Sequence, residues 1–181
     1  MIEESLKSVQ GKSIVNSISL KGGEEEFLRQ GLLCMRFGAA VIIRAFDEQG
    51  QAASYEDKVR ICQRSYRLLR SGLGFPPEDI IFDYSVMTIA TGPPEHGNTA
   101  STSLAVDEIK RPCPCVSSTG VLGNLSCQFR ELYALRDVMP SVFLYHAMPR
   151  GLNLPLRRRR ADLQEDLRGR YLEQAAALEV V

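Results

Sequence analysis

The fold class is decided by residues 39–83, which read AAVIIRAFDEQGQAASYEDKVRICQRSYRLLRSGLGFPPEDIIFD. The stretch opens with a continuous apolar run, residues 39–43, as a strand buried on both faces requires. Residues 55–73 then place apolar side chains at helical spacing, which predicts an amphipathic helix that ends before Gly74. A second β-rich run follows at residues 79–83. Strand, helix and strand in this order predict a parallel βαβ unit.

The same alternation continues on both sides of this unit. A β-branched run at residues 13–18 precedes a segment with helical spacing at residues 24–37, and residues 114–117 predict a fourth strand. Four such units amount to about half of a (β/α)₈ barrel, which typically needs about 250 residues. We therefore predict an α/β fold that is a partial TIM barrel.

Helical segments are also predicted in the second half of the chain, over residues 99–110 and 132–148. Pro140 should kink or interrupt the latter, because proline lacks the N–H that a helix interior needs. Residues 161–178 are rich in strong helix formers. The run Arg157–Arg160 is interpreted as a solvated segment before a helix, with contacts to phosphate groups of RNA or to a polyglutamate tail as the alternative.

Composition excludes several classes of protein. The 181 residues are 44% apolar and 24% charged with zero formal net charge, so no overall field attracts nucleic acid or an anionic membrane. No apolar run approaches the roughly 20 residues that cross a bilayer. Two acids follow the first two residues, where a signal peptide would be basic, so we expect a cytoplasmic protein.

Five cysteines are present, and an odd number without a secretory signal argues against a disulfide framework. Cys113 and Cys115 are close in sequence, but a zinc site normally needs a second pair of ligands. We expect free, mostly buried thiols and no metal site.

Each predicted strand ends in polar residues, and in parallel α/β folds function collects at the carboxyl ends of strands. The first strand ends at Asn16-Ser17, the second at Asp47-Glu48 and the third at Asp83, while Asn124 lies in the loop after the fourth. Carboxylates and carboxamides in such a ring suit recognition of a polar heterocycle. The alternative is that these residues only cap the helices that follow.

Four strings then resemble the methyltetrahydrofolate domain of cobalamin-dependent methionine synthase. They are IVNSISLK (residues 14–21), AFDEQGQA (45–52), GFPPEDIIFD (74–83) and VFLYHA (142–147). The resemblance is near-continuous to about residue 92, patchy to about residue 153, and then lost. It implies a domain at residues 1–153, covering roughly strands 4–7 of a pterin-binding, dihydropteroate synthase-like barrel, and a divergent basic and helical tail at residues 154–181.

The resemblance also implies site residues. Asp83 would accept N–H groups of the pterin, Asn16 would lie close to the pterin ring, and Asn124, the catalytic candidate, would hydrogen-bond near N5. Arg130 matches an arginine after that loop. As N5 gains a proton, the Asn124 contact would strengthen, which is differential binding of the transition state.

Other matched positions depart from the family pattern. Ser85, a candidate pterin contact, stands where the family has asparagine, and Tyr84 stands where it has proline. A Gly-Gly pair is reduced to Gly120-Val121, with Gly120 still a candidate contact. Asp47 and Glu48 match an acidic strand end whose implied role is more structural.

The activity implied is that of a methyltransferase of methionine biosynthesis. The methyl group of 5-methyltetrahydrofolate would pass to cob(I)alamin presented by a separate domain, and homocysteine would be methylated on a zinc-bearing domain; neither domain is in this chain. The alternative is a non-catalytic remnant of the barrel that binds folate weakly or only associates with other chains. Open barrel edges would favour self-association. Dihydropteroate synthesis, on the same fold, is disfavoured by the matching strings.

Overall fold

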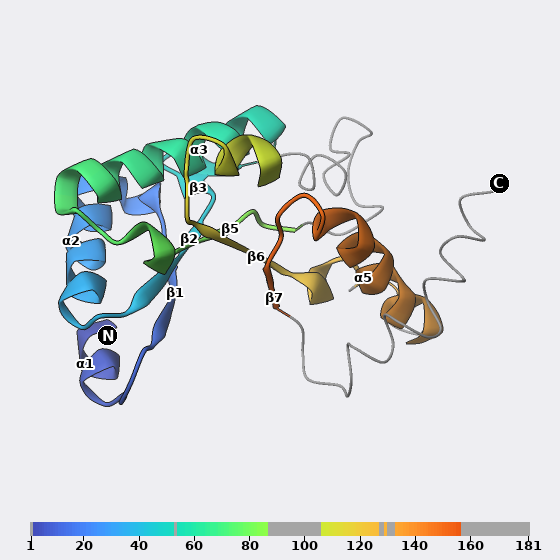
Figure 1. Cartoon of the computed structure of the whole chain (residues 1–181), viewed down its shortest axis with the longest axis horizontal. Helices are drawn as coiled ribbons and strands as arrows, with labels where there is room; N and C mark the ends of the chain where they lie inside the picture. Colours follow the sequence, from blue (N-terminus) through green and yellow to red (C-terminus); the bar gives the residue numbers. More distant parts are fainter. Residues whose placement is uncertain (1, 53, 87–105, 127–128, 130–132, 157–181) are drawn as a thin grey trace.

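The computed structural model describes residues 2–52, 54–86, 106–126, 129 and 133–156 (Figure 1). Its centre is a sheet of five parallel strands in the order β1-β2-β5-β6-β7. The strands are β1 (Ile14–Ile18), β2 (Ala40–Arg44), β5 (Ile80–Asp83), β6 (Ser117–Val121) and β7 (Leu154–Leu156). This confirms the predicted parallel α/β architecture. The described strands form an open sheet, not a closed barrel, as a partial barrel requires.

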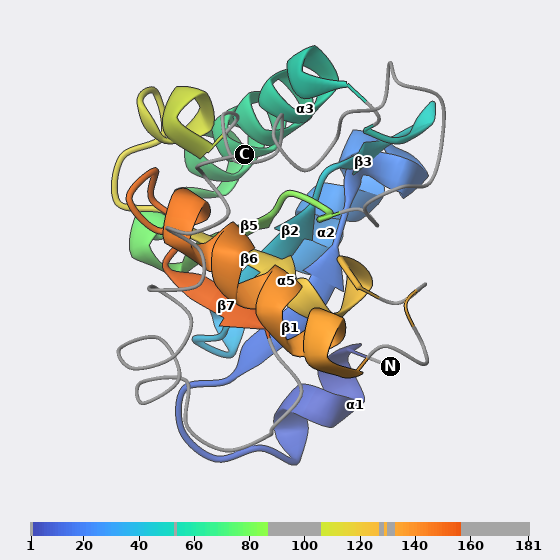
Figure 2. The same cartoon turned by 90° about the vertical axis from the view of Figure 1, so that its right-hand side faces the viewer.

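Helices connect the strands and cover the sheet. The longer ones are α1 (Ile2–Lys7), α2 (Gly23–Arg36), α3 (Tyr55–Arg67) with its continuation η2 (Leu68–Leu73), and α5 (Tyr133–Ala147); short turns are η1 (Leu20–Gly22), η3 (Pro77–Asp79) and η5 (Leu122–Asn124). Figures 1 and 2 show α2 and α3 beside the β1 and β2 end of the sheet and α5 near β6 and β7. A two-stranded hairpin of β3 (Phe46–Asp47) and β4 (Gly50–Gln51) follows β2.

The predicted helices agree with this arrangement where the structure describes them. Residues 24–37, 55–73 and 132–148 correspond to α2, α3 with η2, and α5. Of the predicted helix at 99–110, residues 106–110 are helical and the rest lie outside the described residues. The arginine run and the predicted tail helix also lie outside them.

The main core lies between the outer face of the sheet and the helices. Val41 and Ile43 of β2 and Ile80 and Phe82 of β5 are fully buried there. They form one cluster with apolar side chains of α2, α3 and η2, including Phe27, Cys34, Ile61, Cys62 and Leu69. Burying a side chain of this size contributes about 1.5–3 kcal/mol. This packing orients the sheet so that alternate residues face the opposite, inner side.

The inner face carries a second, smaller apolar cluster of Ala40, Ile42 and Ile81. Both faces of β2 are therefore apolar, which explains the continuous apolar run at residues 39–43. At the sheet edge the inner face is open, and Ile14 of β1 is 56% exposed.

The fourth strand differs from its predicted position. The sequence pattern favours residues 114–117, whereas β6 begins at Ser117 and ends at Val121. Residues 111–115 form turns, and Cys115 has a φ of 66°. Ser, Thr and Gly in β6 have little of the β-branched apolar character that marks a strand, so the sequence pattern placed the strand too early.

A fifth strand, β7, lies in a segment that the sequence analysis assigned to the tail. It pairs with β6, Leu154 opposite Thr119. The Asn153 side-chain oxygen accepts the backbone N–H of Ser118 at 2.8 Å and so extends the ladder by one bond. Pro155 is tolerated because an edge strand can lack one donor. In the part of the chain that the structure describes, the parallel sheet therefore has five strands where four were predicted.

Helix α5 is not interrupted at Pro140. Proline leaves the carbonyl of the residue four positions earlier, here Arg136, without its helical donor. The hydroxyl of Ser126 donates to that carbonyl at 3.4 Å. A side chain from outside the helix thus replaces the missing bond, which sequence spacing alone does not reveal.

Lys58 of α3 is fully buried, and burial lowers its pKa to about 8 from the ordinary value of 10.5. The folded state therefore resists the lysine charge, and this penalty disappears as pH rises above about 8. We expect the stability of the wild type relative to Lys58→Met to increase by about 1–3 kcal/mol as pH rises from near 8 toward 10.5.

Urea unfolding of both proteins across that range measures the difference. Taking the difference cancels the titration of the Tyr84 phenol, whose pKa burial raises. The Cys62 thiol interacts with the Lys58 charge, but burial raises the pKa of that thiol well above its ordinary value. A difference that does not change with pH would show that Lys58 titrates like a solvated lysine.

Candidate functional site

The inner face of the sheet changes from apolar to polar toward the carboxyl ends of its strands. On this face β2 carries Ile42 and then Arg44, and β5 carries Ile81 and then Asp83. Ile42 is in register with Ile81 and Arg44 with Asp83, so both pairs share the inner face. Thr119 of β6 is in register with Asp83. An apolar floor is therefore bordered by a polar rim.

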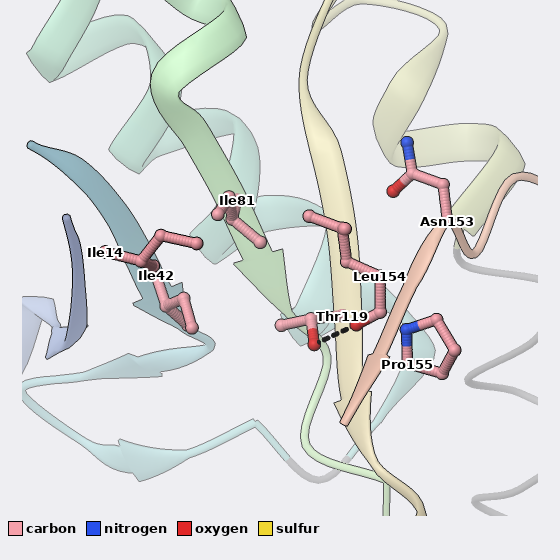
Figure 3. Close-up of a pocket in the computed structure, with 7 residues that line it drawn as sticks. All are labelled: Ile14, Ile42, Ile81, Thr119, Asn153, Leu154 and Pro155. Carbon is pink, nitrogen blue, oxygen red and sulfur yellow. Dashed lines mark hydrogen bonds between the residues drawn. The ribbon is translucent and has the colours of Figure 1, made fainter. Parts of the chain in front are cut away.

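A cavity of about 230 Å³ opens on the apolar floor (Figure 3). The described residues that line it are Ile14, Ile42, Ile81, Thr119, Asn153, Leu154 and Pro155. Figure 3 shows the three isoleucines coming from β1, β2 and β5, with Thr119 donating a 2.5 Å hydrogen bond to the Leu154 carbonyl. This lining suits an apolar surface or a flat ring better than a charged group.

The three main candidates from the sequence, Asn16, Asp83 and Asn124, are not among the described residues that line this cavity. Asn16 is exposed on the edge strand β1 and is in register with Ile42. Because Ile42 is in register with Ile81, Asn16 lies at a level two residues before Asp83 along the sheet. Asn124 is exposed in η5, directly after β6. Asp83 and Asn124 thus lie at the carboxyl ends of neighbouring strands, and Asn16 lies lower on the edge of the same face.

Asp83 is a buried carboxyl group at the carboxyl end of β5, with 6% of the residue exposed. Its Oδ1 accepts the backbone N–H of Ser85 at 2.9 Å, and its Oδ2 lies 3.9 Å from Nε of Arg44. Burial raises the pKa of Asp83 above its ordinary value, while the Ser85 N–H and the Arg44 charge oppose that rise. A buried acceptor held in this way is suited to bind N–H donors.

Ser85 follows Asp83 in the left-handed region, with a φ of 52°. Its hydroxyl is buried and has no hydrogen-bond partner among the described residues. Buried polar groups in folded proteins are nearly always paired, so an unpaired hydroxyl beside Asp83 is a group that a polar ligand would satisfy.

Gly120 lies on β6 at a position where a side chain would point at Val86. A Cβ added there would lie 2.5 Å from Cγ2 of Val86. The position therefore needs glycine for packing between β6 and the segment after β5, whether or not a ligand approaches.

The side chain of Asn124 is tied to the same segment. Its Nδ2 donates to the carbonyl of Val86 at 3.3 Å. With the amide nitrogen engaged, the side-chain oxygen is the group that remains available as an acceptor.

Asp47 and Glu48 hold the hairpin. Asp47 is buried and pairs with Arg60 of α3 at 2.9 Å, and Glu48 pairs with Arg64 at 2.9 Å. The Arg64 guanidinium lowers the pKa of Glu48 to about 2. Both acids are engaged in ion pairs with α3. Arg130 lies outside the described residues.

Two rim residues were missed in the sequence analysis, Arg44 and Thr119. The signal for Arg44 was a charged residue that ends an apolar run two positions after Ile42, at the same level as Asp83 on the next strand. Thr119 sits in a weak strand and became recognisable only from its pairing.

Among the described residues, no group of three or more His, Cys, Asp and Glu side chains could hold a metal ion. The described cysteines, Cys34, Cys62, Cys113 and Cys115, are free, and the first three are buried. Burial raises the pKa of Cys34 and of Cys113 to about 11, so these thiols are weak nucleophiles. In the part of the chain described, no helix is long and apolar enough to cross a bilayer.

Comparison with known protein families places most of the chain in a family. The family described as pterin binding enzyme matches residues 1–155, a range that takes in the five-stranded sheet up to β7.

The packing around Gly120 gives a direct test. Gly120→Ala should lower the free energy of unfolding by about 1–3 kcal/mol, because Val86 is β-branched and cannot easily rotate away from the new methyl group. Urea unfolding measures the loss, and adding Val86→Ala should recover part of it.

Gly123→Ala is the matched control, since a Cβ there would meet no heavy atom within 4 Å. Equal destabilisation by both glycine substitutions would contradict the packing role of Gly120.

Proposed function

Because the chain belongs to the pterin-binding enzyme family, we propose that its polar rim binds the pterin ring of a reduced folate, with 5-methyltetrahydrofolate as the substrate. Asp83 carries the argument: it is a buried carboxylate at the carboxyl end of a strand, close to the Ser85 hydroxyl, which has no hydrogen-bond partner among the described residues. A pterin ring presents several N–H donors on one edge, which is the chemistry that such a carboxylate accepts.

The apolar floor supports the same proposal. The isoleucine-lined cavity of about 230 Å³ lies directly below the row that contains Asp83. A flat heterocycle can place a face or an edge on this floor while its N–H groups reach the rim. Small-molecule sites commonly combine an apolar lining with a few placed polar groups.

The reaction we propose is transfer of the N5 methyl group to cob(I)alamin, in the manner of cobalamin-dependent methionine synthase. The strings at residues 14–21, 45–52 and 74–83 support this branch of the family over dihydropteroate synthesis. The corrinoid and homocysteine would be presented by other domains, and the corrinoid would supply the nucleophile. The free thiols of this chain agree with a reducing compartment, for which we propose the cytoplasm.

Asn124 would offer a hydrogen-bond acceptor to N5, as this reaction requires. Its amide nitrogen is held by the Val86 carbonyl, so its oxygen is the atom that would face N5. A methyl group leaves N5 more readily when the nitrogen is protonated, and an acceptor stabilises that proton. Asn124 would therefore contribute more to the transition state than to the bound substrate.

We expect Asp83→Asn to weaken binding of 5-methyltetrahydrofolate by about tenfold or more, because an amide cannot accept paired N–H bonds as a carboxylate does. Its thermal stability without ligand should be unchanged or higher, since the substitution removes a buried charge whose pKa burial raises. Thermal melts of the full chain with and without excess ligand measure both effects.

Glu78→Gln is the matched control, because it removes an exposed carboxylate just before the amino end of β5. Absence of any ligand-dependent shift in the wild type would overturn the proposed function. A shift in the wild type with no formation of methylcobalamin from added cob(I)alamin would favour the non-catalytic folate-binding alternative. Retained transfer by Asn124→Ala would contradict the role given to Asn124.

A further inference from the structure

Arg44 is a cation on the inner face that neither the main core nor the proposed carboxylate contact requires. It is the last residue of β2 and is in register with Asp83, the last residue of β5. Its side chain is 45% exposed, whereas that of Asp83 is 8% exposed. A donor and an acceptor thus stand side by side on neighbouring strands, with the donor on the solvent side.

The position of the guanidinium is set by its surroundings. Cζ of Arg44 lies 4.7 Å from the centroid of the Phe46 ring, an arrangement in which a cation is attracted to the aromatic face. Phe46 belongs to the β3–β4 hairpin, and that hairpin is fastened to α3 by the Arg60 and Arg64 ion pairs. Helix α3 therefore places the ring that orients Arg44.

The N–H groups of the Arg44 guanidinium do not form a hydrogen bond with Asp83. Nε of Arg44 is 3.9 Å from Oδ2 of Asp83, which is an ion-pair distance but too long for a hydrogen bond. A guanidinium has five N–H donors in a planar fork and no acceptor. Stacking on Phe46 uses the face of that fork and leaves its edge free to donate in the plane.

We propose that Arg44 and Asp83 together read one edge of the pterin, Asp83 accepting from the 2-amino and ring N–H groups and Arg44 donating to the 4-oxo oxygen. This inference rests on the proposed function. It makes Arg44 a specificity-determining residue, because the same pair disfavours a ring that carries an amino group at position 4. In a neutral 2,4-diaminopteridine the second amino group would point its donors at the donors of Arg44, leaving both unpaired. N3 of that ring also carries no hydrogen, so the Asp83 contact is weakened as well and Arg44 accounts for one part of the preference.

The test compares two ring systems without side chains, pterin and 2,4-diaminopteridine, at a pH where both are neutral. Ligand-observed NMR titration of the full chain gives the two dissociation constants. We expect the wild type to prefer pterin by about tenfold or more, as expected for a hydrogen bond to a charged donor. Arg44→Met should lose the part of this preference that comes from the 4-oxo contact, several-fold, through weaker binding of pterin, while the Asp83 contact to the ring N–H keeps the rest. Arg44→Lys, which keeps the charge without the planar fork, should retain part of it.

Arg36→Met is the matched control, since it removes an exposed arginine at the end of α2, before the amino end of β2, and should leave the preference unchanged. Because the Arg44 side chain is half exposed, its replacement should also leave the thermal melt of the free protein close to that of the wild type. A preference in Arg44→Met within about twofold of the wild-type value would overturn the inference. Binding of pterin by the wild type without any preference would also overturn it while sparing the proposed function, whereas binding of neither ring would reject both.

Discussion

The pairing of β2 with β5 is the constraint on which the rest of the molecule depends. Both strands are apolar on two faces, so they can be placed only inside a sheet that is covered on its outer side by helices. Their register sets Ile42 against Ile81 and, two residues later, Arg44 against Asp83. The apolar floor and the polar rim of the site are therefore formed by successive inward-facing residues of the same two strands.

Placing Asp83 on this face has a cost, because a carboxylate with 6% exposure loses most of its hydration. The backbone N–H of Ser85 and the nearby Arg44 offset part of that cost. The hydroxyl of Ser85, two residues further on, has no hydrogen-bond partner in the part of the chain that the structure describes. A site that is incompletely satisfied in this way favours a ligand that brings donors, which is the physical basis of the proposal that the rim binds a pterin.

The periphery of the site is held by polar contacts rather than by apolar packing. The arginines of α3 fasten the hairpin through Asp47 and Glu48, and so place Phe46 beside Arg44. At the other side, Asn153 and Thr119 fasten β7 to β6 and complete the wall of the cavity. These contacts join residues that are far apart in sequence, and each has the geometry of a single specific hydrogen bond or ion pair.

The sequence by itself determined the parallel α/β class, the positions of β1, β2 and β5, and the family, because apolar periodicity and the matching strings are local properties of the chain. It also pointed to Asp83, since a polar residue at the end of a buried strand is visible without a structure. Only the tertiary structure decided that β7 belongs to the sheet, that α5 continues through Pro140, and that Asp47 and Glu48 hold the hairpin while Arg44 faces the site. The physical reason is that these features depend on partners distant in sequence: Ser118 for Asn153, Ser126 for the Arg136 carbonyl, and the register of two strands for Arg44 and Asp83.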